Sequence, residues 1–396
     1  MRPVPVVVAA LGIAQILGWG SSFYFPAVLA APIVADTGWS LAWVIGGVSI
    51  GLLVAGVIAP RVGSIIDRKG GRPVLAASSL LYALGLTGIG LAPALPVYLL
   101  GWLVLGAGMG TGLYDAVFAA LGKLYGAEAR KPITNLTLIG GFASTVCWPL
   151  SALLAETVGW RGACFVYAGL HLAMALPLQM AVMPKASLLP SDESARVDDR
   201  EPQGAHVAGY DHGTFALLAL VLTVSSGIGS IVVVHLLIFL QASGASFADA
   251  VAMGTLFGPA QVGARAIERV FGERYHPIWT LVASCAAMAI GLALLLVNFA
   301  ILAVAVVIYA GGYGIMWIAR GTLPLALYGP ARYATLMGRL ALPSLVVQAL
   351  APSAAALLVE RSGAIATVAA LNALALANVL LVAMLWAACR RIRSGR

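Results

Sequence analysis

Residues 63–73 have the sequence Gly-Ser-Ile-Ile-Asp-Arg-Lys-Gly-Gly-Arg-Pro, a charged segment between two long apolar runs. The segment is too short to form a domain of its own. A short charged loop between two apolar helices predicts a hairpin whose arms cross a membrane in opposite directions. The fold is therefore expected to consist of membrane-spanning helices.

The composition of the chain agrees with this class. Of its 396 residues, 61% are hydrophobic and 10% are charged, and the mean hydropathy is +0.98. A soluble chain of this length could not hide so much apolar surface from water. The net charge of +8 comes from Lys and Arg in short loops, so membrane topology accounts for it and no nucleic-acid partner is expected. Four single cysteines without a Cys-x-x-Cys pair indicate neither a metal site nor a cofactor.

Twelve apolar runs are long enough to cross a membrane, six on each side of a polar stretch. The polar stretch, residues 185–212, is rich in Asp, Glu, Ser, Pro and Arg, which predicts a flexible cytoplasmic linker. We expect an N-terminal six-helix bundle at 1–184 and a C-terminal six-helix bundle with a short basic tail at 213–396. The expected spans are 4–34, 41–60, 74–91, 97–121, 132–155, 160–183, 213–240, 247–271, 278–297, 300–326, 334–359 and 364–389.

The distribution of basic residues predicts the orientation. Nearly every Lys and Arg falls on one face when the spans alternate in direction. The positive-inside rule places that face, with both termini and the linker, in the cytoplasm.

Short sequence matches between the two halves indicate an internal repeat. Residues 35–42, Ala-Asp-Thr-Gly-Trp-Ser-Leu-Ala, are similar to residues 241–248, Gln-Ala-Ser-Gly-Ala-Ser-Phe-Ala, and both segments follow the first span of a half. The fourth spans carry Gly-Met-Gly at 108–110 and Gly-Tyr-Gly at 312–314. Because the matches fall at corresponding spans, they predict duplication of a six-helix unit.

The order Gly-x-x-x-Asp-Arg-x-Gly-x-Arg-Pro in residues 63–73 resembles the signature between spans 2 and 3 of the major facilitator superfamily. The resemblance implies an all-α membrane fold of twelve helices in two parallel repeats, with a substrate between them that is exposed to each side in turn. It also implies a secondary transporter and not an enzyme. The sequence has no Gly-x-x-x-x-Gly-Lys-[Ser/Thr] loop for ATP, so a solute or ion gradient, with protons as a candidate, must supply the energy.

Four residues of this segment are expected to form a conformational gate. Gly63 lies one helical turn before Asp67, and glycine lets a second helix come close. The Asp67 carboxylate can accept from N-terminal amides of a neighbouring helix, or it can pair with Arg68 or Arg72. Such a latch would hold one state of a two-state carrier. A solvated turn would explain the basic residues but neither Asp67 nor the glycine spacing.

Residues 38–45, Gly-Trp-Ser-Leu-Ala-Trp-Val-Ile, and the basic segment after span 4 resemble the monocarboxylate and oxalate porter branch of the superfamily. That resemblance implies a substrate-binding arginine on span 8, where Arg265 stands. The branch places an acidic residue for proton coupling one turn earlier, but this chain has Gln261 there, and glutamine cannot titrate. An anion exchanger could work without a titrating partner.

Other polar residues within the spans are further candidates. Asp115 on span 4 and Arg320 on span 10 occupy nearly equivalent positions, and facing lipid would cost each about 2.5–3.5 kcal/mol, so both should face the interior. They could form a gate pair, or they could bind an anion or carry a proton. Tyr24 could stack on a substrate. His235 could line the substrate cavity, or it could form a hydrogen bond between helices.

These features favour a secondary active transporter that moves a small organic anion, such as a monocarboxylate. We expect it to act as a monomer in the bacterial cytoplasmic (inner) membrane. The alternative is efflux of a toxic drug-like compound or metalloid by proton antiport, with Asp115 as the coupling acid. A non-transporting membrane sensor is a further alternative, but it would need a soluble domain through which to signal.

Overall fold

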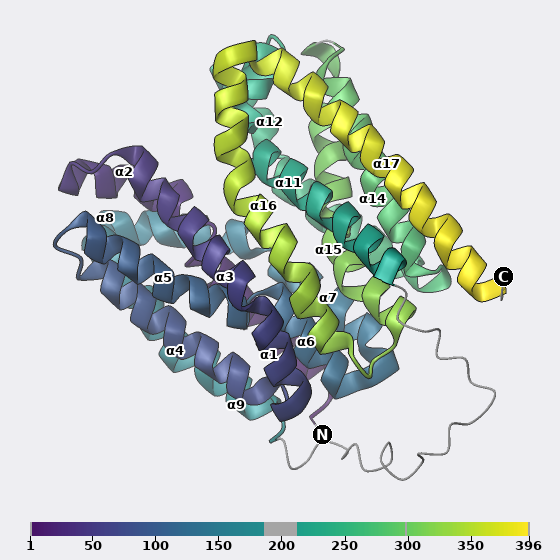
Figure 1. The fold of residues 1–396 in the computed structure, drawn as a ribbon. Coiled ribbons are helices and arrows are strands. Elements are labelled where there is room, and N and C mark those ends of the chain that lie inside the picture. Colours follow the sequence, from purple (N-terminus) through teal and green to yellow (C-terminus); the bar gives the residue numbers. More distant parts are fainter. Residues whose placement is uncertain (1, 186–211, 298, 395–396) are drawn as a thin grey trace.

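The computed structural model describes residues 2–185, 212–297 and 299–394. Within these residues the chain is helical and contains no strand. Figure 1 shows the helices of the first half, in purple and blue, beside those of the second half, in teal to yellow. The expected linker falls almost entirely on residues 186–211, which lie outside the described residues, so the domain boundaries stay a prediction.

The helices of the first half follow its six expected spans. In chain order the spans are α1 (Val4–Gly20) with α2 (Phe25–Thr37), α3 (Leu41–Lys69), α4 (Gly71–Gly90), α5 (Leu95–Gly112) with α6 (Tyr114–Tyr125), α7 (Arg130–Gly140) with the start of α8 (Ala143–Leu170), and the rest of α8 with α9 (Leu176–Val182). The fifth and sixth spans meet within α8 at Gly159, whose positive φ of 71° breaks the helix. A 3₁₀ turn, η1 (Gly126–Ala129), precedes α7, and a π-helical turn, η2 (His171–Ala175), precedes α9.

The second half repeats this plan. Its spans are α11 (His212–Ala242), α12 (Phe247–Gly254) with α13 (Phe257–Phe271), α14 (Pro277–Leu295), α15 (Leu302–Tyr328), α16 (Tyr333–Ser362) and α17 (Ala364–Ser394). Two 3₁₀ turns, η4 (Gly272–Arg274) and η5 (Phe299–Ile301), precede α14 and α15.

Nine helical stretches in the described chain are long and apolar enough to cross a membrane. One of them, Leu95–Val182, is 88 residues long and contains three of the expected spans. The pair α12 and α13 is not among the nine, because a break at residues 255–256 leaves two short helices. The predicted all-α membrane fold of twelve helices is confirmed.

The predicted loop at residues 63–73 is wrong in one respect. Helix α3 continues to Lys69, so Gly63, Asp67 and Arg68 lie on a helix and not in a loop. The turn into α4 needs a single residue, Gly70, whose φ of 76° is a conformation that glycine adopts readily.

The two glycine pairs of the repeat make equivalent contacts. Gly108 packs against α4 and Gly110 against α3, so that a Cβ on either would press on the neighbouring helix. In the second half, Gly312 packs against α14 and Gly314 against α13 in the same way. Each fourth span thus packs on the third and second spans of its own half through small residues.

Four spans are interrupted where the two halves face each other. The breaks lie at residues 21–24, 113, 141–142 and 255–256. Non-helical backbone at membrane depth is tolerated only where it is buried in protein or lines a cavity. These breaks therefore point to the place where a cavity should lie.

Candidate functional site

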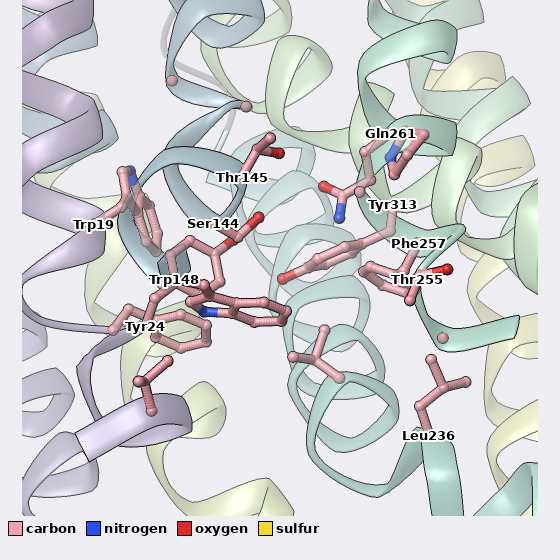
Figure 2. Close-up of a pocket in the computed structure, with 18 of the residues that line it drawn as sticks. Trp19, Tyr24, Ser144, Thr145, Trp148, Leu236, Thr255, Phe257, Gln261 and Tyr313 are labelled. Carbon is pink, nitrogen blue, oxygen red and sulfur yellow. The ribbon is translucent and has the colours of Figure 1, made fainter. Parts of the chain in front are cut away.

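A cavity of about 810 Å³ lies between the two halves and is bordered by the interrupted spans. Much of its wall is aromatic. The first half contributes Trp19, Phe23, Tyr24, Tyr114 and Trp148, and the second half contributes Phe257, Tyr313 and Trp317. In Figure 2, Trp19, Tyr24 and Trp148 approach from one side, while Phe257, Tyr313 and Gln261 approach from the other.

Arg265 on α13 gives this cavity its charge. No Asp, Glu, Lys or His stands among the described residues that line it. The Arg265 side chain is only 3% exposed. Its Nε donates to the carbonyl oxygen of Gly314 at 3.0 Å, its Nη1 to that of Thr137 at 2.8 Å, and its Nη2 to Gln261 Oε1 at 3.1 Å.

These bonds leave the Arg265 charge without a carboxylate among the described residues. A guanidinium has five N–H donors, so these three bonds leave one donor on each terminal nitrogen, and the neutral Tyr114 hydroxyl lies within hydrogen-bonding reach of the guanidinium. Neutral carbonyl and amide oxygens orient the cation but do not neutralise it. A buried cation is costly unless it is paired, and a carboxylate can accept from both terminal nitrogens at once. The arrangement therefore leaves a buried positive charge in the cavity wall that no described carboxylate neutralises.

The glycine pair Gly140-Gly141 allows Arg265 to reach the first half. A Cβ on Gly141 would collide with Arg265 Nη1, and one on Gly140 would collide with the Tyr114 hydroxyl. The break between α7 and α8 follows directly, so the Thr137 carbonyl lies within reach of the guanidinium. The sequence analysis missed this pair, although adjacent glycines within an apolar run are a visible signal of close approach.

Asp115 and Arg320 lie together but do not line the cavity. Arg320 Nε and Nη2 donate to the two Asp115 carboxylate oxygens at 2.7 and 3.0 Å, which joins α15 to α6 across the two halves. The Arg320 side chain is 1% exposed. Its guanidinium carbon lies 5.6 Å from the centre of the Trp317 ring, and Trp317 does line the cavity. The ion pair therefore lies behind the aromatic wall.

Tyr24 and His235 differ in their placement. Tyr24 lines the cavity, and its ring centre lies 6.2 Å from that of Trp148 in an edge-to-face contact. His235 is buried outside the lining, where Nδ1 lies 3.1 Å from the carbonyl oxygen of Ile231 on its own helix and the ring stacks on Phe239. The structure thus brings Arg265, Gln261 and Tyr24 together and leaves His235 apart.

The contact made by Asp67 crosses the two halves. Asp67 Oδ2 accepts from the Thr335 backbone N–H at 3.0 Å and also from the Thr335 hydroxyl. Thr335 lies in the first turn of α16, where backbone N–H groups lack partners within the helix. Arg68 donates to the Ser64 carbonyl oxygen at 3.4 Å. In the part of the chain that the structure describes, neither Arg68 nor Arg72 forms an ion pair with Asp67.

Close packing of α3 and α16 accompanies this contact. A Cβ on Gly63 would collide with the Ala334 carbonyl oxygen, and a Cβ on Gly338 would collide with that of Ala59. The sequence analysis identified Gly63 but missed Gly338 and Thr335, because nothing in the sequence showed which face of the later span would meet α3.

The hydrogen bonds between the halves gather towards the end of the molecule that carries the chain ends. Besides the Asp67 contact, Arg130 donates to the Gly272 carbonyl oxygen and Arg269 donates to Asn135 Oδ1. The cavity residues of α2 and α12 lie towards the opposite end. These hydrogen bonds therefore join the two halves at that end of the molecule.

Two buried donors in the cavity wall have no acceptor in the described residues. They are Trp19 Nε1 and Gln348 Nε2. The sequence analysis did not identify either residue, since tryptophan and glutamine within apolar spans gave no distinctive pattern. Buried polar groups are usually hydrogen-bonded, so water or a ligand would satisfy them.

Comparison with known proteins identifies the fold. The family model described as Major Facilitator Superfamily matches residues 11–269. The chain is 28% identical over 292 residues to an "Uncharacterized 38 kDa protein in 23S RNA operon" of Thermoproteus tenax. The aligned region covers 73% of this chain and 71% of that protein.

Three solved structures share the fold at low sequence identity. The human organic anion transporter MFSD10 (TETRAN) has a TM-score of 0.75 at 17% identity and covers 96% of this chain and 100% of its own. The proton:xylose symporter XylE has a TM-score of 0.70 at 13% identity, and the match covers 95% of this chain and 94% of XylE. The transporter FucP, in its outward conformation, has a TM-score of 0.70 at 12% identity, and the match covers 97% of this chain and 99% of FucP.

Proposed function

The chain belongs to the major facilitator superfamily of secondary transporters, and from this premise we propose that it moves a small organic anion by alternating access. The family makes it a multi-pass membrane protein and a transporter of some small solute, not an enzyme. Our proposal adds the charge of the solute and the residues that bind it.

The observation that carries the proposal is the state of Arg265. It is buried, it lines the cavity between the halves, and it has two N–H donors left and no acid beside it among the described residues. A carboxylate would both neutralise the cation and accept from those donors. Gln261 holds one terminal nitrogen in place, and Tyr24 lies in the wall beside the anion.

The fold neighbours do not decide the substrate. An organic anion transporter and a xylose symporter have similar TM-scores to this chain, and their identities are below 20%. The anionic substrate class therefore rests on Arg265. The monocarboxylate and oxalate porter branch is consistent with that residue, and Gln261 in the place of the acid favours anion exchange over proton symport.

The contacts near the chain ends support a role as a gate. Gly63, Asp67 and Thr335 would keep the halves together on the face that carries both termini, with Arg68 at the end of α3 and Arg72 at the start of α4. The Asp115–Arg320 pair would form a second, deeper gate. We assign this face to the cytoplasm of a bacterial cell by the positive-inside rule, so that the cavity faces outward across the inner membrane. We propose that the monomer is the transporting unit.

Transport into proteoliposomes tests the anion site. Arg265→Gln should abolish uptake of carboxylates, while Arg361→Gln, which changes an exposed arginine on α16, should keep it. Size-exclusion chromatography and thermal unfolding would show that both variants fold. Equal uptake of carboxylates by the wild type and Arg265→Gln would disprove the proposal.

Efflux of a drug-like compound is the second candidate, and the aromatic cavity wall supports it. The carboxylate that would serve it, Asp115, is bonded through both oxygens to Arg320 and lies outside the lining. Increased sensitivity of the host to such compounds on deletion of the gene, without a growth defect on carboxylates, would favour efflux.

A further inference from the structure

We infer that the substrate is a carboxylate with one negative charge and an aromatic body, such as an aryl or arylalkyl carboxylate, and not a short hydroxy acid or a dicarboxylate. The inference rests on the proposed function, because Arg265 binds the carboxylate in both. The inference adds the number of negative charges on the substrate and the shape of its uncharged part.

The charge of the cavity limits the substrate to one carboxylate. Arg265 is the only ionisable side chain with a formal charge among the described residues that line the cavity. Its two remaining donors match the two oxygens of one carboxylate. The polar remainder of the lining is neutral and includes Ser144, Thr145 and Thr255. A second carboxylate would enter the cavity without a cation to offset its desolvation, which is costly.

The walls of the cavity suit a ring. The rings of Trp19, Tyr114 and Trp317 contact one another with centre-to-centre distances of 5.2 to 5.6 Å, which makes a continuous aromatic surface beside Arg265. Aromatic rings attract each other at such distances, in edge-to-face or offset arrangements. An aromatic substrate would continue this surface, whereas a sugar or a short hydroxy acid has no ring face to place against it.

Trp148 lines the cavity and is not fully covered by other residues. The residue is 46% exposed, and its ring contacts that of Tyr24 edge to face. Figure 2 shows the Trp148 ring extending from the Tyr24 side towards Tyr313 and Phe257. Burying an aromatic face under a ligand is favourable by about 25 cal/mol per Å² of apolar surface. A ring between Trp148 and Tyr313 would gain this burial.

The size of the cavity agrees with this substrate class. Pockets for drug-sized ligands measure about 300–1,000 Å³, and this cavity measures about 810 Å³. A three-carbon acid would leave most of the cavity filled with water against aromatic walls. A ring with a carboxylate would cover Trp148 while its charged end reached Arg265.

The binding of four probes to the purified wild-type protein tests the inference. The probes are 2-naphthoate, lactate, the dicarboxylate naphthalene-2,6-dicarboxylate and the neutral 2-naphthamide, followed by quenching of tryptophan fluorescence and by calorimetry. We expect 2-naphthoate to bind at least tenfold more tightly than each of the other three. Equal or tighter binding of lactate or of the dicarboxylate would overturn the inference.

Variants distinguish this inference from the proposed function. Trp148→Ala should weaken 2-naphthoate about tenfold and leave lactate unchanged, and Trp148→Phe should restore most of the loss. Arg265→Gln should weaken both acids. Transport of lactate that depends on Arg265, together with unchanged binding of 2-naphthoate to Trp148→Ala, would show that the substrate is not aromatic. The proposed anion site at Arg265 would then remain supported. If 2-naphthamide binds as well as 2-naphthoate, and Arg265→Gln changes neither, both are wrong.

Discussion

Asp67 accepts two hydrogen bonds from Thr335, one from the backbone N–H and one from the hydroxyl, and these bonds join α3 of the first half to α16 of the second. The acceptor is a charged carboxylate, and the donor N–H lies in the first turn of a helix, where negative charge is favoured. One side chain thus stabilises the packing of two helices that must separate if the halves are to open on this face.

Replacing Asp67 tests its role as a latch. Asp67→Asn removes the charge but keeps an oxygen acceptor, so it should weaken the contact by about 1 kcal/mol, the difference between a hydrogen bond to a charged group and one to a neutral group. The population that is open on the face of the chain ends should rise by about fivefold. Cysteine accessibility at positions on α16 near Thr335 would measure it. Glu360→Gln, at an exposed position of the same helix, is the control and should have no effect.

The close approach of α3 and α16 predicts a steric effect at Gly63. Gly63→Ala would place a methyl group against the Ala334 carbonyl oxygen, so the halves should separate on this face and the Tm should fall. Gly46→Ala on the same helix is the matched control, because nothing lies within 4 Å of its Cβ. The control should keep or slightly raise the Tm, since alanine favours helices by about 1 kcal/mol over glycine. An equal Tm for the two variants would contradict the close packing.

The Asp115–Arg320 pair predicts that a double variant is more stable than either single variant. Asp115→Asn or Arg320→Gln alone leaves an unpaired buried charge and should destabilise the fold by about 3–5 kcal/mol. The double variant removes both charges and should regain most of that loss, as measured by thermal unfolding in detergent. If the double variant is stable but its transport no longer responds to a proton gradient, Asp115 carries a proton as well as pairing.

An acid in the place of Gln261 should make anion binding depend on pH. Gln261→Glu places a carboxyl group against Arg265. The ionised carboxylate would neutralise the guanidinium, whereas the protonated carboxylic acid would leave the guanidinium charge available to an anion. Binding of an aryl sulfonate probe, which stays anionic at low pH, should therefore be weak at pH 7 and recover once the pH is low enough to protonate the new carboxylate. Gln261→Met cannot titrate, so its binding should show no such recovery.

Much of the architecture could be predicted from the sequence, because apolar runs of membrane length set the positions of the spans. The sequence also indicated Asp67 and Gly63 through their spacing, and the family resemblance indicated Arg265. The partners Thr335 and Gly338 could not be predicted, since every face of a membrane helix is apolar and periodicity does not show which face meets another helix. For the same reason His235 could not be separated from the cavity residues.

The hydrogen bond from Arg265 to the Thr137 carbonyl oxygen runs from one half of the protein to the other, while the bond to Gly314 stays within the second half. The guanidinium that would bind the anion therefore also joins the two halves by a hydrogen bond. A carboxylate that accepts from the two remaining donors would draw the guanidinium towards the cavity, so we expect binding to weaken the bond to the Thr137 carbonyl oxygen. We would then expect the carrier to change state more readily with an anion bound than without one, and such a dependence would couple the entry of one anion to the exit of another.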